Sequence, residues 1–258
     1  MKNQLAFSTL GCPAWDMDTI ITNAVAFGYD AIELRGYLDV MDLPLAAPFM
    51  PENRAETKRK LTDAGIAVCC VSSSGVIATG NLDHVKSHCE LAHALGAPHV
   101  RIFGGKPESC EIALTNLRAF GDAAAEAGVS LVLETHDDFS TGETVAALLA
   151  EAAHPAVFAL WDLHHPYRQG EAIEDTHRLL APTLRHIHIK DGIAGHYTLL
   201  GEGDVPVFPM LTLARGSGYT GAISLEWEKR WHPELPDPEI AFPQYAKAVR
   251  AWLDSFSG

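Results

Sequence analysis

The sequence has few basic side chains, and they form no cluster. Lysine and arginine together number 19 against 33 aspartates and glutamates, which gives a formal net charge of −14. Nucleic-acid binding depends on clustered cations, so this balance argues against a phosphate backbone as a partner. We therefore expect a small-molecule partner and no nucleic acid.

Long hydrophobic runs and a cysteine framework are also missing. No window approaches the 18 or so uninterrupted apolar residues of a membrane-spanning helix, and "MKNQLAFSTLGCPAW" lacks a signal-peptide pattern. The five cysteines are an odd number, and Cys69 and Cys70 are adjacent, so neither a disulfide framework nor a CxxC zinc site is indicated. We expect a cytoplasmic protein with reduced, buried cysteines and no membrane partner. A homo-oligomer is compatible with the sequence.

One alternating pattern of strand-like and helical segments repeats along the whole chain. Short β-type runs alternate with segments of helical spacing, such as "ETKRKLTDAG", several of which end at a glycine. This alternation predicts parallel pairing with right-handed crossovers, and eight such units close into an α/β fold, the (β/α)8 TIM barrel. We expect a single domain over residues 1–258, with an open doubly wound sheet as the alternative. The predicted strands are residues 5–10, 31–36, 67–73, 99–105, 130–136, 157–164, 184–191 and 222–228.

The last four predicted strands end in ionisable residues. Active sites of TIM barrels lie at the C-terminal ends of the strands, so these side chains should share the barrel mouth. Three carboxylates in a poorly solvated mouth repel one another unless a cation holds them. Separate salt bridges or helix caps would explain any one of these residues, but their equivalent depth favours a metal. The sequence therefore predicts a divalent-metal site formed by Glu134, Asp162, His188 and Glu226.

The stretch "LRHIHIKD", residues 184–191, shows which way its side chains point. Alternate residues of a strand face opposite sides. Ile187 and Ile189 should pack on the helices, while His186, His188 and Lys190 should face the barrel axis.

The segments "LETH", "WDLHH", "HIHIKD", "LGEGD" and "GYTGAISLEWE" resemble the sugar-phosphate isomerase/epimerase superfamily. These xylose-isomerase-like TIM barrels include ketose 3-epimerases, inosose dehydratase and endonuclease IV. The resemblance covers essentially the whole chain. It matches Glu134, Asp162, His188 and Glu226 with the family's metal ligands, and His165 with a histidine that contacts substrate oxygen.

The resemblance implies a divalent-metal-dependent isomerase or epimerase with Glu134 and Glu226 as catalytic acid and base. The substrate would be a sugar, a sugar phosphate or a polyol-derived ketone, and the intermediate a metal-stabilised enediolate. The alternative is a metal-dependent lyase that dehydrates an inosose or a related keto-cyclitol or keto acid. One divalent ion is expected, Mn²⁺ first, with Mg²⁺, Co²⁺ and Zn²⁺ also compatible with these ligands.

Other features bear on the substrate and on the remaining alternatives. Ketose 3-epimerases carry an arginine shortly after the histidine ligand, where this chain has "KDGIAG". An endonuclease would need extra ligands, for which the candidates are His84, His88 and His93, and the acidic charge argues against it. A sugar-binding protein without catalysis would not need both Glu134 and Glu226.

The expected substrate contacts besides His165 are His136, Lys190 and Trp15. Lys190 could instead pair with Asp191 or Glu228, and Trp15 could simply pack in the core. The remaining inward candidates are Glu33, Arg35 and Arg101.

Overall fold

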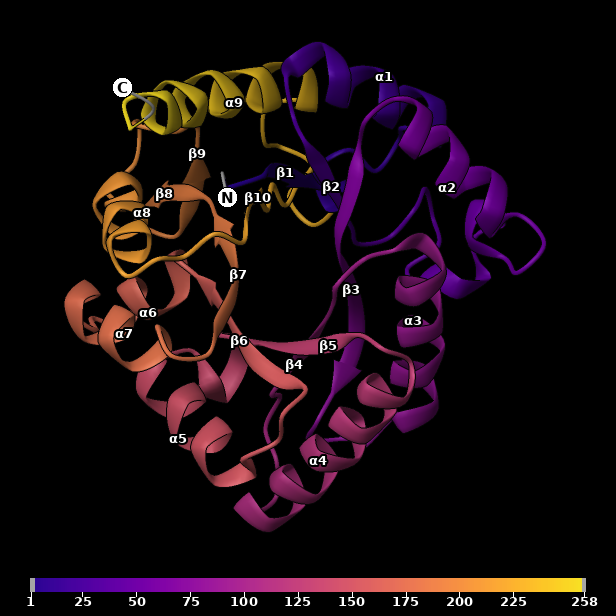
Figure 1. Ribbon diagram of the computed structural model, residues 1–258. Coiled ribbons are helices and arrows are strands. Elements are labelled where there is room, and N and C mark those ends of the chain that lie inside the picture. Colours follow the sequence, from indigo (N-terminus) through magenta and orange to yellow (C-terminus); the bar gives the residue numbers. More distant parts are fainter. Residues whose placement is uncertain (1–2, 257–258) are drawn as a thin grey trace.

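The computed structural model describes residues 3–256, and within them eight parallel strands close into one barrel. The strands follow the order β1-β10-β7-β6-β5-β4-β3-β2, and the helices surround them (Figure 1). The predicted (β/α)8 TIM barrel is confirmed, and the open-sheet alternative is wrong. The barrel strands are β1 (Leu5–Ser8), β2 (Ala31–Leu34), β3 (Ala67–Val76), β4 (His99–Phe103), β5 (Ser130–Glu134), β6 (Val157–Asp162), β7 (Leu184–Ile189) and β10 (Ala222–Leu225).

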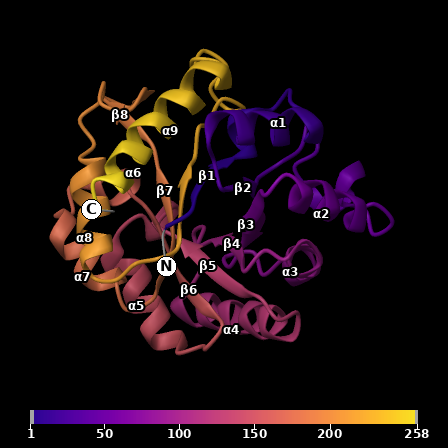
Figure 2. The same cartoon turned by 45° about the horizontal axis from the view of Figure 1, so that its top comes forward.

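The helices begin and end at local signals in the sequence. Asp16 caps the first helix by accepting a 2.8 Å hydrogen bond from the Thr19 N–H, and Gly28, at φ 78°, ends it in the left-handed region that favours glycine. The last helix lies beside the first and completes the ring (Figures 1 and 2). The α-helices are α1 (Met17–Phe27), α2 (Arg54–Asp63), α3 (Leu82–Leu95), α4 (Cys110–Glu126), α5 (Gly142–Ala152), α6 (His164–Arg168), α7 (Ile173–Leu180), α8 (Val207–Gly216) and α9 (Pro238–Asp254), and the 3-10 turns are η1 (Thr9–Gly11), η2 (Leu43–Leu45), η3 (Ala47–Phe49) and η4 (Asp137–Phe139). Across residues 3–256, no helix has both the length and the apolar character needed to span a membrane.

Several strands end earlier than predicted, because the chain leaves the ladder at the barrel mouth. The sixth strand stops at Asp162, where α6 follows, and the last stops at Leu225, one residue before Glu226. An antiparallel hairpin of β8 (Asp191–Ile193) and β9 (His196–Thr198) follows β7 and was not predicted. The residues beyond the paired strands are therefore the ones free to line the mouth.

The core has two apolar parts, one between the strands and the helices and one inside the barrel. Between strands and helices, Trp161, Ile187 and Trp227 are fully buried, and burying one such side chain contributes about 1.5–3 kcal/mol. A separate cluster of small and branched residues fills the inside of the barrel, namely Ala6, Ala31, Cys69, Cys70, Val132, Leu160 and Ala222. The cysteines are free, as expected, but Cys110 is exposed rather than buried because it begins α4 at the surface.

Candidate metal and catalytic site

The four predicted metal ligands converge at the barrel mouth. Each of Glu134, Asp162, His188 and Glu226 offers one ligand atom, and these atoms lie within 4.8 Å of one another. The Nδ1 atom of His188 lies 3.5 Å from Glu226 Oε1, 3.7 Å from Glu134 Oε1 and 4.0 Å from Asp162 Oδ2. The site is thus a compact set of one nitrogen and three carboxylates, and all four residues are buried.

Strand register explains why residues so far apart in the chain meet. Asp162 pairs with His188 across β6 and β7, and His188 pairs with Ser224 across β7 and β10. Side chains two residues apart on a strand share a face, so Glu226 points the same way as Ser224. Glu134 on β5 pairs with Leu160, two residues before Asp162, so the parallel strands bring all four side chains to the same end of the barrel.

Lys190 supplies a positive charge to these carboxylates. Its side chain is 1% exposed, and Nζ lies 2.5 Å from Glu226 Oε2 and 2.8 Å from both Glu228 Oε1 and Asp162 Oδ2. The ion pair with Glu228, proposed from the sequence as the alternative to a substrate contact, is present. A contact between Lys190 and substrate stays a prediction.

The two predicted catalytic glutamates favour their charged forms. Burial and the neighbouring Glu226 both act to raise the pKa of Glu134, but Arg101, with Nη1 at 3.1 Å from Oε2, and His188 lower it to about 2. Burial also opposes ionisation of Glu226, yet Lys190 and His188 hold its pKa well below the usual range. Both carboxylates can therefore accept a proton at neutral pH.

The donor set fits a divalent cation. His188 Nδ1 is buried and makes no hydrogen bond, although it faces three carboxylates. One imidazole nitrogen with several carboxylate oxygens suits Mn²⁺, Mg²⁺, Co²⁺ or Zn²⁺. An ion held by Glu134, Asp162, His188 and Glu226 would satisfy this nitrogen and neutralise the carboxylates.

The predicted substrate-binding histidines lie beside the ligands. His165 Nε2 is 3.7 Å from Asp162 Oδ2, and the side chain is 22% exposed. Burial, followed by the charge of Lys190, lowers the pKa of His165 to about 4, so it is neutral at pH 7. His136 packs edge-on against His165 with ring centroids 4.8 Å apart, and its Nδ1 lies 2.8 Å from Asp137 Oδ1.

Trp15 lies in the hydrophobic core. Its ring packs against Phe242 with centroids 5.6 Å apart, and its indole N–H donates to Glu239 Oε1 at 3.2 Å. Only 7% of the residue is exposed. The packing role considered from the sequence is therefore present, and a substrate contact by Trp15 stays a prediction.

Asp191 is a structural acceptor and not a partner of Lys190. Its carboxylate accepts hydrogen bonds from the N–H groups of Gly192, Gly201, Gly203 and Val205, at 2.8–3.2 Å. This carboxylate therefore holds the "LGEGDVPV" segment, residues 200–207, against the end of β7. The sequence motif has a backbone-anchoring function.

Two neighbours of the site carried little or no sequence signal. Tyr197 lies on the unpredicted β8–β9 hairpin, with its ring centroid 5.5 Å from Lys190 Nζ. The ring centroids of Tyr197 and His232 lie 5.3 Å apart, so the segment after β10 lies beside the hairpin. Tyr197 and His232 border a cavity of about 390 Å³. Arg101, the second neighbour, follows from strand alternation, but its pairing with Glu134 does not.

A second group, Asp42, His84 and His88, lies apart from the four ligands. His84 Nε2 accepts a 3.1 Å hydrogen bond from the Ser74 N–H, so neutral His84 carries its hydrogen on Nδ1, the atom 3.7 Å from Asp42 Oδ1. A metal needs a lone pair at that position. The group therefore does not supply the extra ligands that a metal cluster of the endonuclease IV kind requires.

Comparison with known proteins assigns the family. The family model "Xylose isomerase-like TIM barrel" matches residues 21–255. The chain belongs to this family. It is 26% identical to inosose dehydratase of Geobacillus thermodenitrificans over 189 residues, 63% of this chain and 61% of that protein. It is 28% identical to fructoselysine 3-epimerase of Escherichia coli O157:H7 over 145 residues, 54% of this chain and 52% of that protein.

The match to these relatives is partial, and the fold is matched more completely. The aligned region spans less than two thirds of each relative's length. Among solved structures, the IolI protein with a bound zinc atom superposes with a TM-score of 0.80 at 16% identity, covering 98% of this chain and 99% of that chain. At that identity the likeness concerns the fold.

Proposed function

We propose that this protein is a divalent-metal-dependent isomerase or epimerase of a sugar, sugar phosphate or polyol-derived ketone. The observation that carries the proposal is the convergence of two ionised glutamates, Glu134 and Glu226, with Asp162 and His188 in one buried set. Binding a sugar alone does not require two carboxylates at one point. Proton transfer next to a carbonyl uses one carboxylate as base, and epimerisation uses a second as acid.

The side chains divide the work as follows. Glu134 and Glu226 exchange a proton with the carbon next to a substrate carbonyl, one as base and the other as acid. The bound ion would polarise the substrate's oxygens and stabilise the negative charge that develops on them. Neutral His165 can donate a hydrogen bond to a substrate oxygen without repelling the ion.

Mn²⁺ is our first candidate for the ion. The IolI structure contains zinc, and Mg²⁺ and Co²⁺ suit the same ligands. The ligand types alone therefore favour no single one of them.

A lyase is the second candidate. The match to inosose dehydratase covers 189 residues, against 145 for fructoselysine 3-epimerase. Dehydration starts from the same proton abstraction and then loses a β-hydroxyl group. The two reactions therefore share the first step and differ in whether water leaves.

The test is proton exchange in D₂O. Keto-sugars, inososes and phosphorylated sugars are incubated with protein and Mn²⁺, and solvent deuterium in the substrate is read by NMR. Glu134→Gln and Glu226→Gln should each lower turnover by about 10²–10⁴-fold, because glutamine keeps an oxygen for the ion but cannot take the proton. The product separates the two candidates, since only a lyase forms a molecule that has lost a hydroxyl.

Glu228→Gln is the matched control. Glu228 also contacts Lys190 but is not among the four ligands, so its loss should affect exchange far less. In an epimerase, each glutamate variant should still exchange the proton of one epimer. Full exchange in both Glu134→Gln and Glu226→Gln would refute the proposal.

A further inference from the structure

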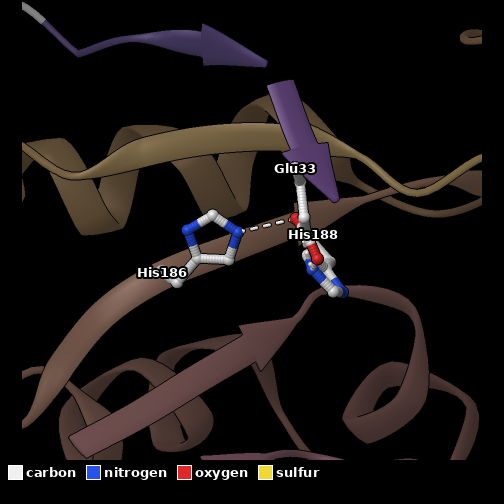
Figure 3. A group of neighbouring side chains, drawn as sticks. All are labelled: Glu33, His186 and His188. Atoms are coloured by element: carbon white, nitrogen blue, oxygen red, sulfur yellow. Dashed lines mark hydrogen bonds and ion pairs between the residues drawn. The ribbon is translucent and has the colours of Figure 1, made fainter. Parts of the chain in front are cut away.

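Below the four ligands, a buried carboxylate joins the second strand to the seventh. Glu33 on β2 faces His186 and His188 on β7, and all three are 0% exposed (Figure 3). His186 Nε2 lies 2.9 Å from Glu33 Oε2, while His188 Nε2 lies 2.9 and 3.0 Å from the two carboxylate oxygens. The hydroxyl of Ser72 donates to Glu33 Oε1 as well. Glu33 thus receives hydrogen bonds from three side chains.

These contacts fix where the histidines carry hydrogen. A carboxylate only accepts hydrogen bonds, so each Nε2 that faces Glu33 must donate. In neutral His188 the lone pair is then on Nδ1, the atom that faces Glu134, Asp162 and Glu226. The same bond fixes the rotation of the ring. Glu33 therefore leaves Nδ1 as the nitrogen through which His188 can bind a metal.

The geometry points to Glu33 as a positioning residue of the metal site, which holds His188 in the tautomer and orientation that binds a divalent ion through Nδ1. The inference rests on the proposed function, because it concerns the same site. Carboxylates that receive the second N–H of a metal-bound histidine typically contribute 10–100-fold to metal affinity.

A second metal ion between Glu33, His186 and His188 is the competing explanation, since their ligand atoms also lie within 4.8 Å of one another. It would require His188 to lose its hydrogen from Nε2 while Nδ1 binds the first ion. It would also displace two hydrogen bonds that already satisfy Glu33. One metal with a carboxylate behind its histidine accounts for every contact without that cost.

The variant Glu33→Gln tests the inference. Glutamine has similar size but only one acceptor oxygen, and its NH₂ group would face N–H or O–H donors from Ser72, His186 or His188. The hydroxyl of Ser72 can rotate and accept from that group, but the neutral amide oxygen is a weaker acceptor for the His188 N–H than the carboxylate is. We expect Glu33→Gln to weaken Co²⁺ binding, followed by its visible absorption, by about 10–100-fold.

The matched control is Ser72→Ala. It removes a donor to the same carboxylate, at the same depth, but leaves the bond to His188. Its Co²⁺ affinity should stay within about threefold of the wild type, well below the loss of about 10–100-fold expected from removing the carboxylate. Equal affinities for wild type and Glu33→Gln would overturn the inference.

A measurement on the wild type keeps the test informative if Glu33→Gln fails to fold. With Zn²⁺ bound, ¹⁵N NMR of the histidines should show hydrogen on Nε2 of both His186 and His188. Coordination of His188 through Nε2 would overturn the inference. If the tautomers are as expected but the protein exchanges no substrate proton in D₂O, only the proposed function is contradicted. A wild type that binds neither Co²⁺ nor Zn²⁺ would contradict both the inference and the proposed function.

Discussion

Replacing Lys190 by methionine should make the metal-free protein much less stable than the wild type. Bound metal should stabilise this variant more than it stabilises the wild type. Lys190 is 1% exposed and lies within 2.8 Å of Asp162, Glu226 and Glu228. Removing one partner of a buried ion pair typically costs about 3–5 kcal/mol, because the opposite charge is left uncompensated. For a chain of this size, each kcal/mol lowers Tm by roughly 2–4 °C. The metal-free variant should therefore melt about 6–20 °C below the wild type.

The metal should reverse part of this loss. Lys190 and a divalent ion are attracted to the same carboxylates, Asp162 and Glu226, so the lysine competes with the ion. We expect Lys190→Met to bind Mn²⁺ at least about tenfold more tightly, a gain of about 1.4 kcal/mol. At saturating Mn²⁺ the rise in Tm should then be larger for the variant than for the wild type.

The assay is thermal unfolding with EDTA and with graded Mn²⁺. Lys60→Met is the control, because Lys60 pairs with Asp18 at the surface, where the two side chains are 41% and 72% exposed. Solvent screens such an exposed pair, so its loss should change stability little. A metal-free Lys190→Met that melts with the wild type, or an equal Mn²⁺ effect on both proteins, would refute this reasoning.

Two further predictions concern histidines. His165→Ala should keep its metal, measured by elemental analysis, and lose turnover; loss of the metal would instead make His165 a ligand. Burial, followed by neighbouring positive groups, lowers the pKa of both His88 and His99 to about 3. Since the unfolded chain binds these protons near pH 6.5, the stability that neutral histidines contribute is present above that pH and is lost as the pH falls toward 3. The free energy of unfolding of His99→Gln, measured with urea from pH 6 to pH 4, should depend on pH less steeply than that of the wild type, by up to about 1.4 kcal/mol per pH unit. An unchanged slope would contradict the low pKa of His99.

The fold and the grouping of the four candidate ligands were accessible from the sequence because both depend on local periodicity. Alternation in "HIHIKD" places His186 and His188 inside the barrel, where both contact Glu33. The barrel order follows from eight repeats of one unit. These features require only knowledge of which face a side chain occupies.

The contacts between strands were less accessible. Glu33 was recognised as an inward candidate, but its bond to His188 joins β2 to β7 across the barrel, and no local pattern encodes that pairing. Tyr197 was missed because the β8–β9 hairpin is short and has no periodicity of its own. Trp15 shows the same limit, because a tryptophan after a strand is equally compatible with a wall of the site and with the packing against Phe242 that the structure has.

The pairing of β1 with β10 that closes the barrel has a consequence for synthesis on the ribosome. Leu5 lies opposite Ile223, so the edge of β1 that does not pair with β2 stays uncovered until β10 has been made. Glu226 follows that last strand, and it is also the last of the four ligands to be translated. Long-range pairing of this kind forms late in folding. Metal loading should therefore follow release of β10 from the exit tunnel, and ribosome-bound chains arrested before β10 should retain no divalent ion.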